Sequence, residues 1–130
     1  MEVLIAIGLL ATAIASLAHL FAVATRANLD AGDTTWATVL AAQKIEELRA
    51  EPFPEPFTGQ FVDYLDAGGI RLGDPGADGR AYTRRWWIEP LAFAPDNTIA
   101  ITVVVSRYRG VEEDGYDAAR LVTLRTRKGP

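Results

Sequence analysis

The sequence contains no cysteine, and this absence excludes disulfide bonds and thiolate metal sites. A single histidine, His19, excludes metal sites built from several histidines and argues against triad chemistry. Basic residues number 13 against 17 acidic ones, and the net charge of -4 gives no electrostatic reason to expect nucleic-acid binding. The chain also lacks the P-loop and GxGxxG patterns, so neither phosphate-binding signature is present.

Charge is distributed very unevenly along the 130 residues. Residues 3–25 contain no Asp, Glu, Lys or Arg, and they correspond to about 35 Å of helix, enough to cross a hydrocarbon core of about 30 Å. A buried core helix of a soluble protein is one alternative, but such helices are usually shorter and interrupted by polar residues. A cleaved secretory signal is another, but it needs a basic segment ahead of the apolar one. The segment therefore predicts a transmembrane helix.

The helical pattern continues beyond the apolar segment without a strong breaker. The first proline is Pro52, and only Gly8 and Gly32 precede it among the glycines. We therefore predict a single helix from residue 3 to about residue 50, which is about 70 Å long.

This helix divides into residues 1–25, a hydrophobic transmembrane or assembly half, and residues 26–50, an amphipathic half. A wide apolar arc on the second half needs a surface to pack on, and a sheet further along the chain is the obvious candidate. The residues predicted to pack the helix on this sheet are Trp36, Leu40, Ile45 and Leu48.

Small residues recur every four positions inside the apolar half, at Gly8, Thr12 and Ser16. Small side chains at this spacing let helices approach closely in lipid, so we expect these three to pack against neighbouring helices. Ordinary membrane-helix composition also produces such a stripe. His19 has no partner residue nearby, and we expect it to be packed or to face an interface rather than to bind a ligand.

Residues 51–81 are rich in Pro, Gly and Asp and are predicted to form an irregular connection, with a short strand around residues 60–65. Their Gly and Asp spacing matches no EF-hand loop, which favours ordinary turns over calcium binding. Three further strands are expected within residues 82–130, at 82–91, 98–108 and 120–127. Short connections favour an antiparallel meander. The sequence thus predicts an α+β fold, a long N-terminal helix packed on a small antiparallel β-sheet of three to four strands.

No convincing catalytic set is present, and we expect neither enzymatic activity nor a cofactor or metal. Arg84 and Arg85 stand beside Trp86 and Trp87, a combination that also occurs on nucleic-acid platforms. Alternation along a strand sends one Arg and one Trp to each face, so a strand with an apolar inner face and a basic outer face explains the run without a ligand. The acidic residues predicted to form a solvated loop are Glu112, Glu113, Asp114 and Asp117.

The first ten residues, MEVLIAIGLL, resemble the N-terminal pattern of type IV pilins and pseudopilins, in which an acidic residue directly precedes an unbroken apolar helix. Residues 41–49, AAQKIEELR, look like the end of the long helix in minor pilins of the PilV type and in type II secretion pseudopilins. The resemblance covers about the first 50 residues and is only architectural beyond them.

The resemblance implies a minor pilin or pseudopilin, a structural subunit held in the inner membrane by one helix. It then assembles through that helix into a cell-surface type IV pilus or a periplasmic type II secretion pseudopilus. The implied partners are other pilin or pseudopilin subunits, an inner-membrane assembly platform and membrane lipid. Family precursors carry a short basic leader ending in Gly, which prepilin peptidase removes, and this sequence begins inside the motif that follows. Prepilin peptidase is therefore a further implied partner if a leader is encoded upstream of Met1.

The resemblance also assigns a role to Glu2. In pilins the equivalent carboxylate meets the N-terminal ammonium of a neighbouring subunit during assembly. The alternative is local, because the dipole and free amides of any helix N-terminus favour a negative charge.

Charges after the apolar segment predict the side of the membrane on which the sheet lies. Residues 26–51 contain three basic and five acidic residues, so they lack the Lys and Arg excess of a cytoplasmic segment and are expected in the periplasm. The alternative function is a single-pass, membrane-anchored periplasmic binding module that does not polymerise.

Overall fold

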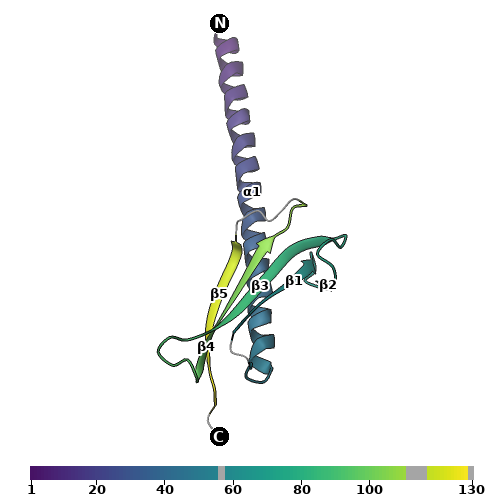
Figure 1. Cartoon of the computed structure of the whole chain (residues 1–130). Coiled ribbons are helices and arrows are strands. Elements are labelled where there is room, and N and C mark those ends of the chain that lie inside the picture. The colour runs from purple at the N-terminus through teal and green to yellow at the C-terminus, as the bar shows by residue number, and fades with distance from the viewer. Residues whose placement is uncertain (56–57, 111–116, 129–130) are drawn as a thin grey trace. The chain divides into compact units, whose positions relative to one another are not determined.

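The computed structural model describes residues 1–55, 58–110 and 117–128. Within them one helix, α1 (Glu2–Ala50), is followed by five strands (Figure 1). The strands are β1 (Gly59–Asp66), β2 (Arg71–Leu72), β3 (Arg80–Pro90), β4 (Thr98–Arg107) and β5 (Asp117–Thr126). The chain divides into two compact units, Met1–Asp33 and Thr34–Pro130, and α1 contributes to both.

The predicted long helix is confirmed, with bounds Glu2–Ala50. Ala and Leu, which have the highest helix propensities, are frequent along it, and no proline interrupts it. The helix ends at Ala50 because Pro52 has no amide hydrogen and disfavours the helical conformation of the residue before it. Glu2 in the first turn and Arg49 in the last turn both carry the charge that the helix dipole favours.

The five strands form one antiparallel sheet in the order β2-β1-β3-β4-β5. The α+β fold and the antiparallel meander are therefore confirmed, but the described part of the chain has five strands rather than three to four. The short strand expected around residues 60–65 is present as β1. The interpretation of the rest of residues 51–81 as irregular is wrong in part, because β2 lies there and β3 begins at Arg80. β2 has only two residues, too few for any alternation to show in the sequence.

The turn between β1 and β2 brings backbone close to the helix. The Asp66 Oδ1 atom accepts hydrogen bonds from the amides of Gly68 and Ile70, at 2.9 and 2.8 Å. Gly69 has a φ of 84°, and a Cβ there would lie 2.8 Å from the Leu40 Cδ2 atom. Glycine is required at this position both by the backbone conformation and by the contact with α1.

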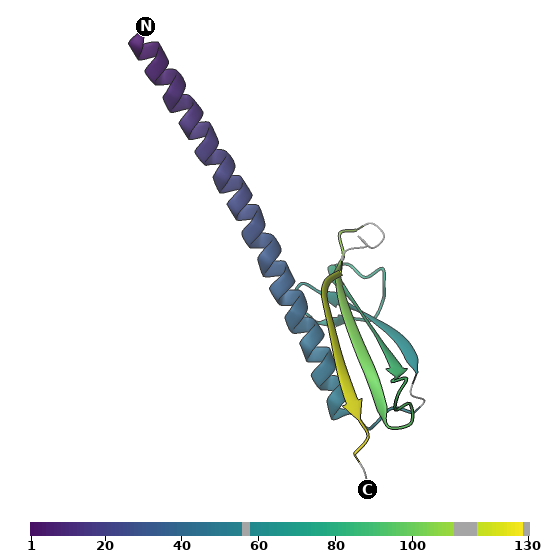
Figure 2. The ribbon, with the colours of Figure 1, turned by 90° about the vertical axis from the view of Figure 1, so that its left-hand side faces the viewer.

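The C-terminal part of α1 lies along one face of the sheet, which we call the inner face (Figure 2). The central strand β4 supplies the middle of the core, and its four inner-face residues are almost completely buried: Ile99, Ile101, Val103 and Val105. Burial of each of these side chains contributes about 1.5–3 kcal/mol to the stability of the fold. The contribution of α1 is Ala37, Leu40, Ala41, Ile45 and Leu48.

The edge strand β5 is less buried than the central strand β4, and its two faces carry different kinds of residue. Thr123 and Arg125 face the helix, where they contact α1, whereas Val122 and Leu124 lie on the opposite, outer face and are 60% and 55% exposed. Of the predicted acidic loop, Asp117 is the exposed first residue of β5, and the Ser106 hydroxyl donates to it at 3.5 Å. Glu112, Glu113 and Asp114 lie outside the described residues.

Candidate functional site

The unit Met1–Asp33 exposes a continuous apolar helix surface. An 18-residue window of α1 has a mean hydropathy of 2.3, and none of that window is buried inside the protein. The large side chains exposed there include Leu4, Ile5, Ile7, Leu9, Leu10, Ile14, Leu17, Leu20 and Phe21. Each such side chain is more stable by about 1.5–3 kcal/mol in an apolar environment than in water. This helix is long and apolar enough to cross a membrane.

The stripe of small residues satisfies its own polar groups. The Thr12 hydroxyl donates to the Gly8 carbonyl oxygen, and the Ser16 hydroxyl donates to that of Thr12, both at 2.8 Å. Neither hydroxyl therefore brings an unpaired donor into an apolar environment. A Cβ at Gly8 would meet nothing within 4 Å, so no contact inside this chain requires glycine there.

Glu2 stands in the first turn of α1, where the amide of Ile5 donates to the Met1 carbonyl oxygen at 3.2 Å. Among the residues that the structure describes, no basic side chain forms an ion pair with Glu2. Its carboxylate is thus available at the start of an uncovered apolar helix, where a second molecule has access to it.

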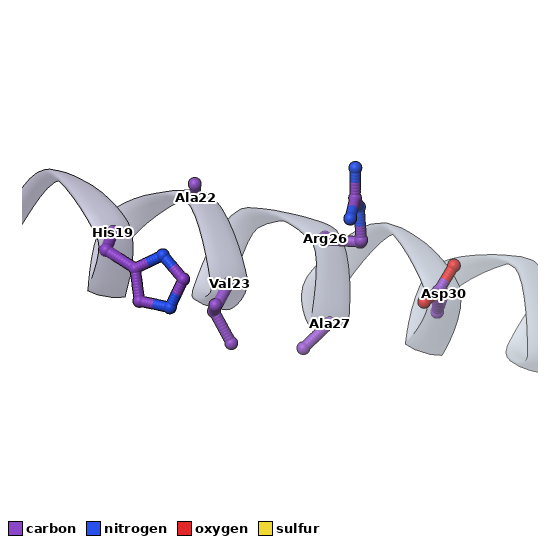
Figure 3. A pocket seen from close by; sticks show the side chains of 6 residues that line it. All are labelled: His19, Ala22, Val23, Arg26, Ala27 and Asp30. Atoms are coloured by element: carbon purple, nitrogen blue, oxygen red, sulfur yellow. The ribbon is translucent and has the colours of Figure 1, made fainter.

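His19 belongs to an open hollow on one side of α1 (Figure 3). The hollow has a volume of about 420 Å³, and its lining residues all come from this one helix: His19, Ala22, Val23, Arg26, Ala27 and Asp30. A hollow walled by a single helix leaves a small ligand open to its surroundings on most sides. It therefore has the character of a helix surface rather than of a ligand pocket.

The lower half of α1 is fixed to the sheet by a buried ion pair. The Arg84 guanidinium donates to both carboxylate oxygens of Asp63, at 3.0 and 2.7 Å, and to the Leu40 carbonyl oxygen of α1 at 3.0 Å. Asp63 and Arg84 are directly opposed on β1 and β3, and both side chains are buried. This bidentate geometry links two strands and the helix at one point.

The predicted division of β3 into an apolar inner and a basic outer face is wrong. Arg84 and Trp86 share the inner face and are buried, whereas Arg85 and Trp87 lie on the outer face and are partly exposed. Burial of Arg84 is tolerated because Asp63 neutralises its charge and the Leu40 carbonyl accepts another of its hydrogens.

A second group of charges extends this ion pair towards the solvent. The ammonium of Lys44 is almost fully buried, lies 4.1 Å from the centre of the Trp86 ring and contacts Glu47 at 3.1 Å. Arg71 of β2 contacts both Glu47, at 3.2 Å, and Asp63, at 3.3 Å. Burial acts to raise the pKa of Glu47, but the hydrogen bond and charge of Lys44 and the charge of Arg71 outweigh it and lower that pKa below its ordinary value.

β5 secures the C-terminal end of α1. The Arg125 guanidinium donates to the carbonyl oxygens of Leu48 and Glu51, at 2.8 and 2.7 Å. The last carbonyls of a helix have no partner within the helix and carry its partial negative charge, so a guanidinium suits this place. The Arg49 side chain donates in return to the Thr123 hydroxyl at 2.9 Å.

The four residues predicted to pack helix on sheet differ in position. Leu40, Ile45 and Leu48 lie in the core cluster. Trp36 lies at the margin, 36% exposed, with its ring near Gly69. Sequence reasoning missed Lys44, Asp63, Arg84 and Arg125 as contacts between helix and sheet. The one available signal was their place at core positions of the helical and strand patterns, where a charged residue needs a partner.

Within residues 1–55, 58–110 and 117–128, no group of three or more His, Asp or Glu side chains is placed to hold a metal ion. The fold defines a class of protein with one apolar, potentially membrane-spanning helix fixed to a small antiparallel sheet. Comparison with protein-family models, characterised proteins and solved structures finds no match to the chain.

Proposed function

We propose that this protein is a minor pilin or pseudopilin, a structural subunit that enters a type IV pilus or type II secretion pseudopilus through its N-terminal helix. The observation that supports this most directly is the uncovered apolar surface of residues 3–25, in a chain whose other unit, Thr34–Pro130, has a core of its own. The apolar surface must be covered by lipid before assembly and by other helices afterwards.

The anchoring of α1 suits such a subunit. Two contacts fix the segment Thr34–Ala50 of the helix to the sheet. The buried Asp63–Arg84 pair holds it at Leu40, and Arg125 holds it at its C-terminal end. A pull on the helix is then transmitted to the sheet through charge-assisted hydrogen bonds rather than through apolar contacts alone. The acidic balance of residues 26–51 supports placing the sheet on the periplasmic side of the inner membrane.

Glu2 provides the test of this function. A carboxylate at a lipid-embedded helix end is costly unless it meets a positive charge, which the N-terminal ammonium of a neighbouring subunit supplies. In cells that assemble the filament, Glu2→Ala is expected to reduce incorporation of the protein by about tenfold or more, the effect of losing at least 1.4 kcal/mol of contact energy. Incorporation is measured as the protein in sheared or purified filaments relative to the membrane fraction.

Membrane insertion is the control in the same cells. Glu2→Ala is expected to remain in the membrane fraction at the level of the unmodified protein, because the apolar segment is unchanged. Glu2→Asp retains the charge and is expected to recover part of the incorporation. Equal incorporation of all three forms would show that the helix is a plain anchor, and the protein would then be a non-polymerising, membrane-held module.

A further inference from the structure

Two edges of the sheet lack a pairing partner among the described residues. β5 pairs only with β4, so its other edge is open along the whole strand. β1 pairs with β2 only at Tyr64 and Leu65, so the outer edge of its first half, from Gly59 to Val62, is open as well. Open edges pair readily with further strands, and proteins usually protect them with charges, prolines or bulges.

Both arginines of β5 are engaged in contacts within the chain. Arg120 lies over the ring of Trp87, 5.6 Å from its centre, and Arg125 is bound to the end of α1. The side chains most exposed near the edge are instead Val122 and Leu124. The open part of β1 is likewise apolar, with Phe61 and Val62 exposed by 47% and 46%.

We infer that β5 of one copy pairs with the open half of β1 of a second copy, so that the sheet continues from subunit to subunit. Each strand from β1 through β3 and β4 to β5 runs antiparallel to its neighbour, so β5 is antiparallel to β1. When two copies have the same orientation, β5 of one copy and β1 of the next are therefore antiparallel. This common direction rests on the proposed function, which anchors every copy in one membrane with one orientation.

Other pairings of the same edges are less favourable. An antiparallel β5–β5 pair turns the two copies end for end, which one membrane does not allow. A parallel β5–β5 pair keeps the direction but places the two α1 helices on opposite faces of the joined sheet.

The contact is heterologous, because each copy offers one edge of each kind. Such a contact repeats from copy to copy, as a ring or a helical array requires. Val62 lies in the same row as Arg85, Val104 and Arg120, which places it on the outer face together with Val122. For copies at equal height, pairing that keeps the faces continuous brings Val62 of one copy near Arg120 of the next, and Val122 is the next outer-face residue along β5.

The absence of cysteine allows a direct crosslinking test in the full-length chain. A variant with both Val62→Cys and Val122→Cys is expressed in membranes and treated with a short bismaleimide, whose reach of about 7 Å accommodates a slip of two residues. The expected product is a ladder of dimers, trimers and higher species. The matched control combines Val62→Cys with Phe93→Cys, because Phe93 is 83% exposed in the connection between β3 and β4, away from both edges.

The edge variant is expected to give at least about tenfold more ladder than the control, because paired strands hold the two thiols at high effective concentration. Val122→Cys alone is expected to give no dimer above background. A ladder no stronger than the control overturns the β1–β5 pairing, and so do strong dimers from Val122→Cys alone, which assign the contact to β5–β5. Repeating the reaction with Glu2→Ala in the same chain separates this contact from assembly through Glu2, because crosslinking is read in membranes and incorporation in filaments.

Discussion

Arg84 shows at the scale of one residue how a charge can determine the packing of this fold. Its guanidinium bonds to Asp63 and to the Leu40 carbonyl, and the residue is only 3% exposed. Arg84→Met is expected to lower the free energy of unfolding by about 3–5 kcal/mol, because it leaves a buried carboxylate with Arg71 as its remaining charged contact. The measurement is denaturant unfolding of the full chain in detergent, followed by tryptophan fluorescence.

The neighbouring arginine is the control for Arg84. Arg85 is partly exposed on the outer face, so Arg85→Met is expected to change the same free energy by about 1 kcal/mol or less. Adding Asp63→Leu to Arg84→Met removes the stranded carboxylate and is expected to restore much of the lost stability. Equal losses from Arg84→Met and Arg85→Met would show that the buried pair does not determine the packing.

Glu47 makes the stability of the fold depend on pH. Its pKa is lowered in the folded protein despite the opposing effect of burial, because Lys44 and Arg71 favour the charged form. A carboxyl group whose folded pKa lies below its unfolded value of about 4.3 stabilises the fold fully above that value, and the contribution disappears as pH falls through the lower, folded pKa. The effect is small because the side chain is 41% exposed and screened by solvent.

The expected outcome for Glu47 is a difference between two pH profiles. Denaturation midpoints of the unmodified chain fall on acidification through the carboxyl range, and those of Glu47→Gln fall less, because the variant has no proton to take up at this position. Above that range the variant is slightly less stable than the unmodified chain. Parallel profiles would show that the contacts of Glu47 with Lys44 and Arg71 do not contribute to stability.

At the scale of secondary-structure elements, β5 and the end of α1 depend on each other. Arg125→Ala removes both hydrogen bonds to the Leu48 and Glu51 carbonyls, so the last turn of α1 is expected to open more easily. A loss of about 1.5–3 kcal/mol corresponds to roughly 10- to 150-fold faster amide exchange in that turn. Hydrogen–deuterium exchange of the peptide that contains residues 46–50 measures it.

Arg120 provides the matched substitution on the same strand. Its side chain lies over Trp87 on the outer face, opposite the face on which α1 packs, so Arg120→Ala is expected to leave exchange in the last turn of α1 unchanged. Arg125→Lys is expected to be intermediate, because an ammonium reaches one carbonyl more readily than two. The same increase from both alanine variants would place the cause in β5 as a whole rather than in the Arg125 contacts.

Elements with a strong periodic signal were predictable from the sequence, and charged contacts between elements were not. Helix α1 is a long run without proline that is first uniformly apolar and then amphipathic, strand β4 follows an alternating segment, and the structure has both. β2 has only two residues, and the turn before it lies against Leu40, a residue distant in sequence. The partner of Arg84 could not be read from the sequence for the same reason, because only the register of β1 against β3 places Asp63 opposite it.

At the scale of the whole molecule, the two units bury their apolar residues in different ways. Thr34–Pro130 contains its own core, in which side chains of α1 meet those of β3 and β4. Met1–Asp33 has no buried residue among its large apolar side chains, so it exposes a continuous apolar surface. The boundary between the units follows Asp33 and lies within residues 26–50, which the sequence predicts as the amphipathic half of the helix.

A charge at the centre of the apolar segment tests whether that segment anchors the protein. Ile14 lies midway along residues 3–25 and is exposed. Ile14→Arg is expected to cost about 2.5–3.5 kcal/mol of insertion free energy. This cost is large because each apolar side chain of the segment contributes only about 0.3–0.6 kcal/mol to insertion. The fraction of protein that resists alkaline extraction from membranes is therefore expected to fall. Gln43→Arg, an exposed change in the sheet-packed half of α1, is expected to leave that fraction unchanged. If the two variants are extracted equally, or if the unmodified chain stays monomeric in water without detergent, then residues 3–25 do not enter lipid and assembly through a membrane helix is excluded.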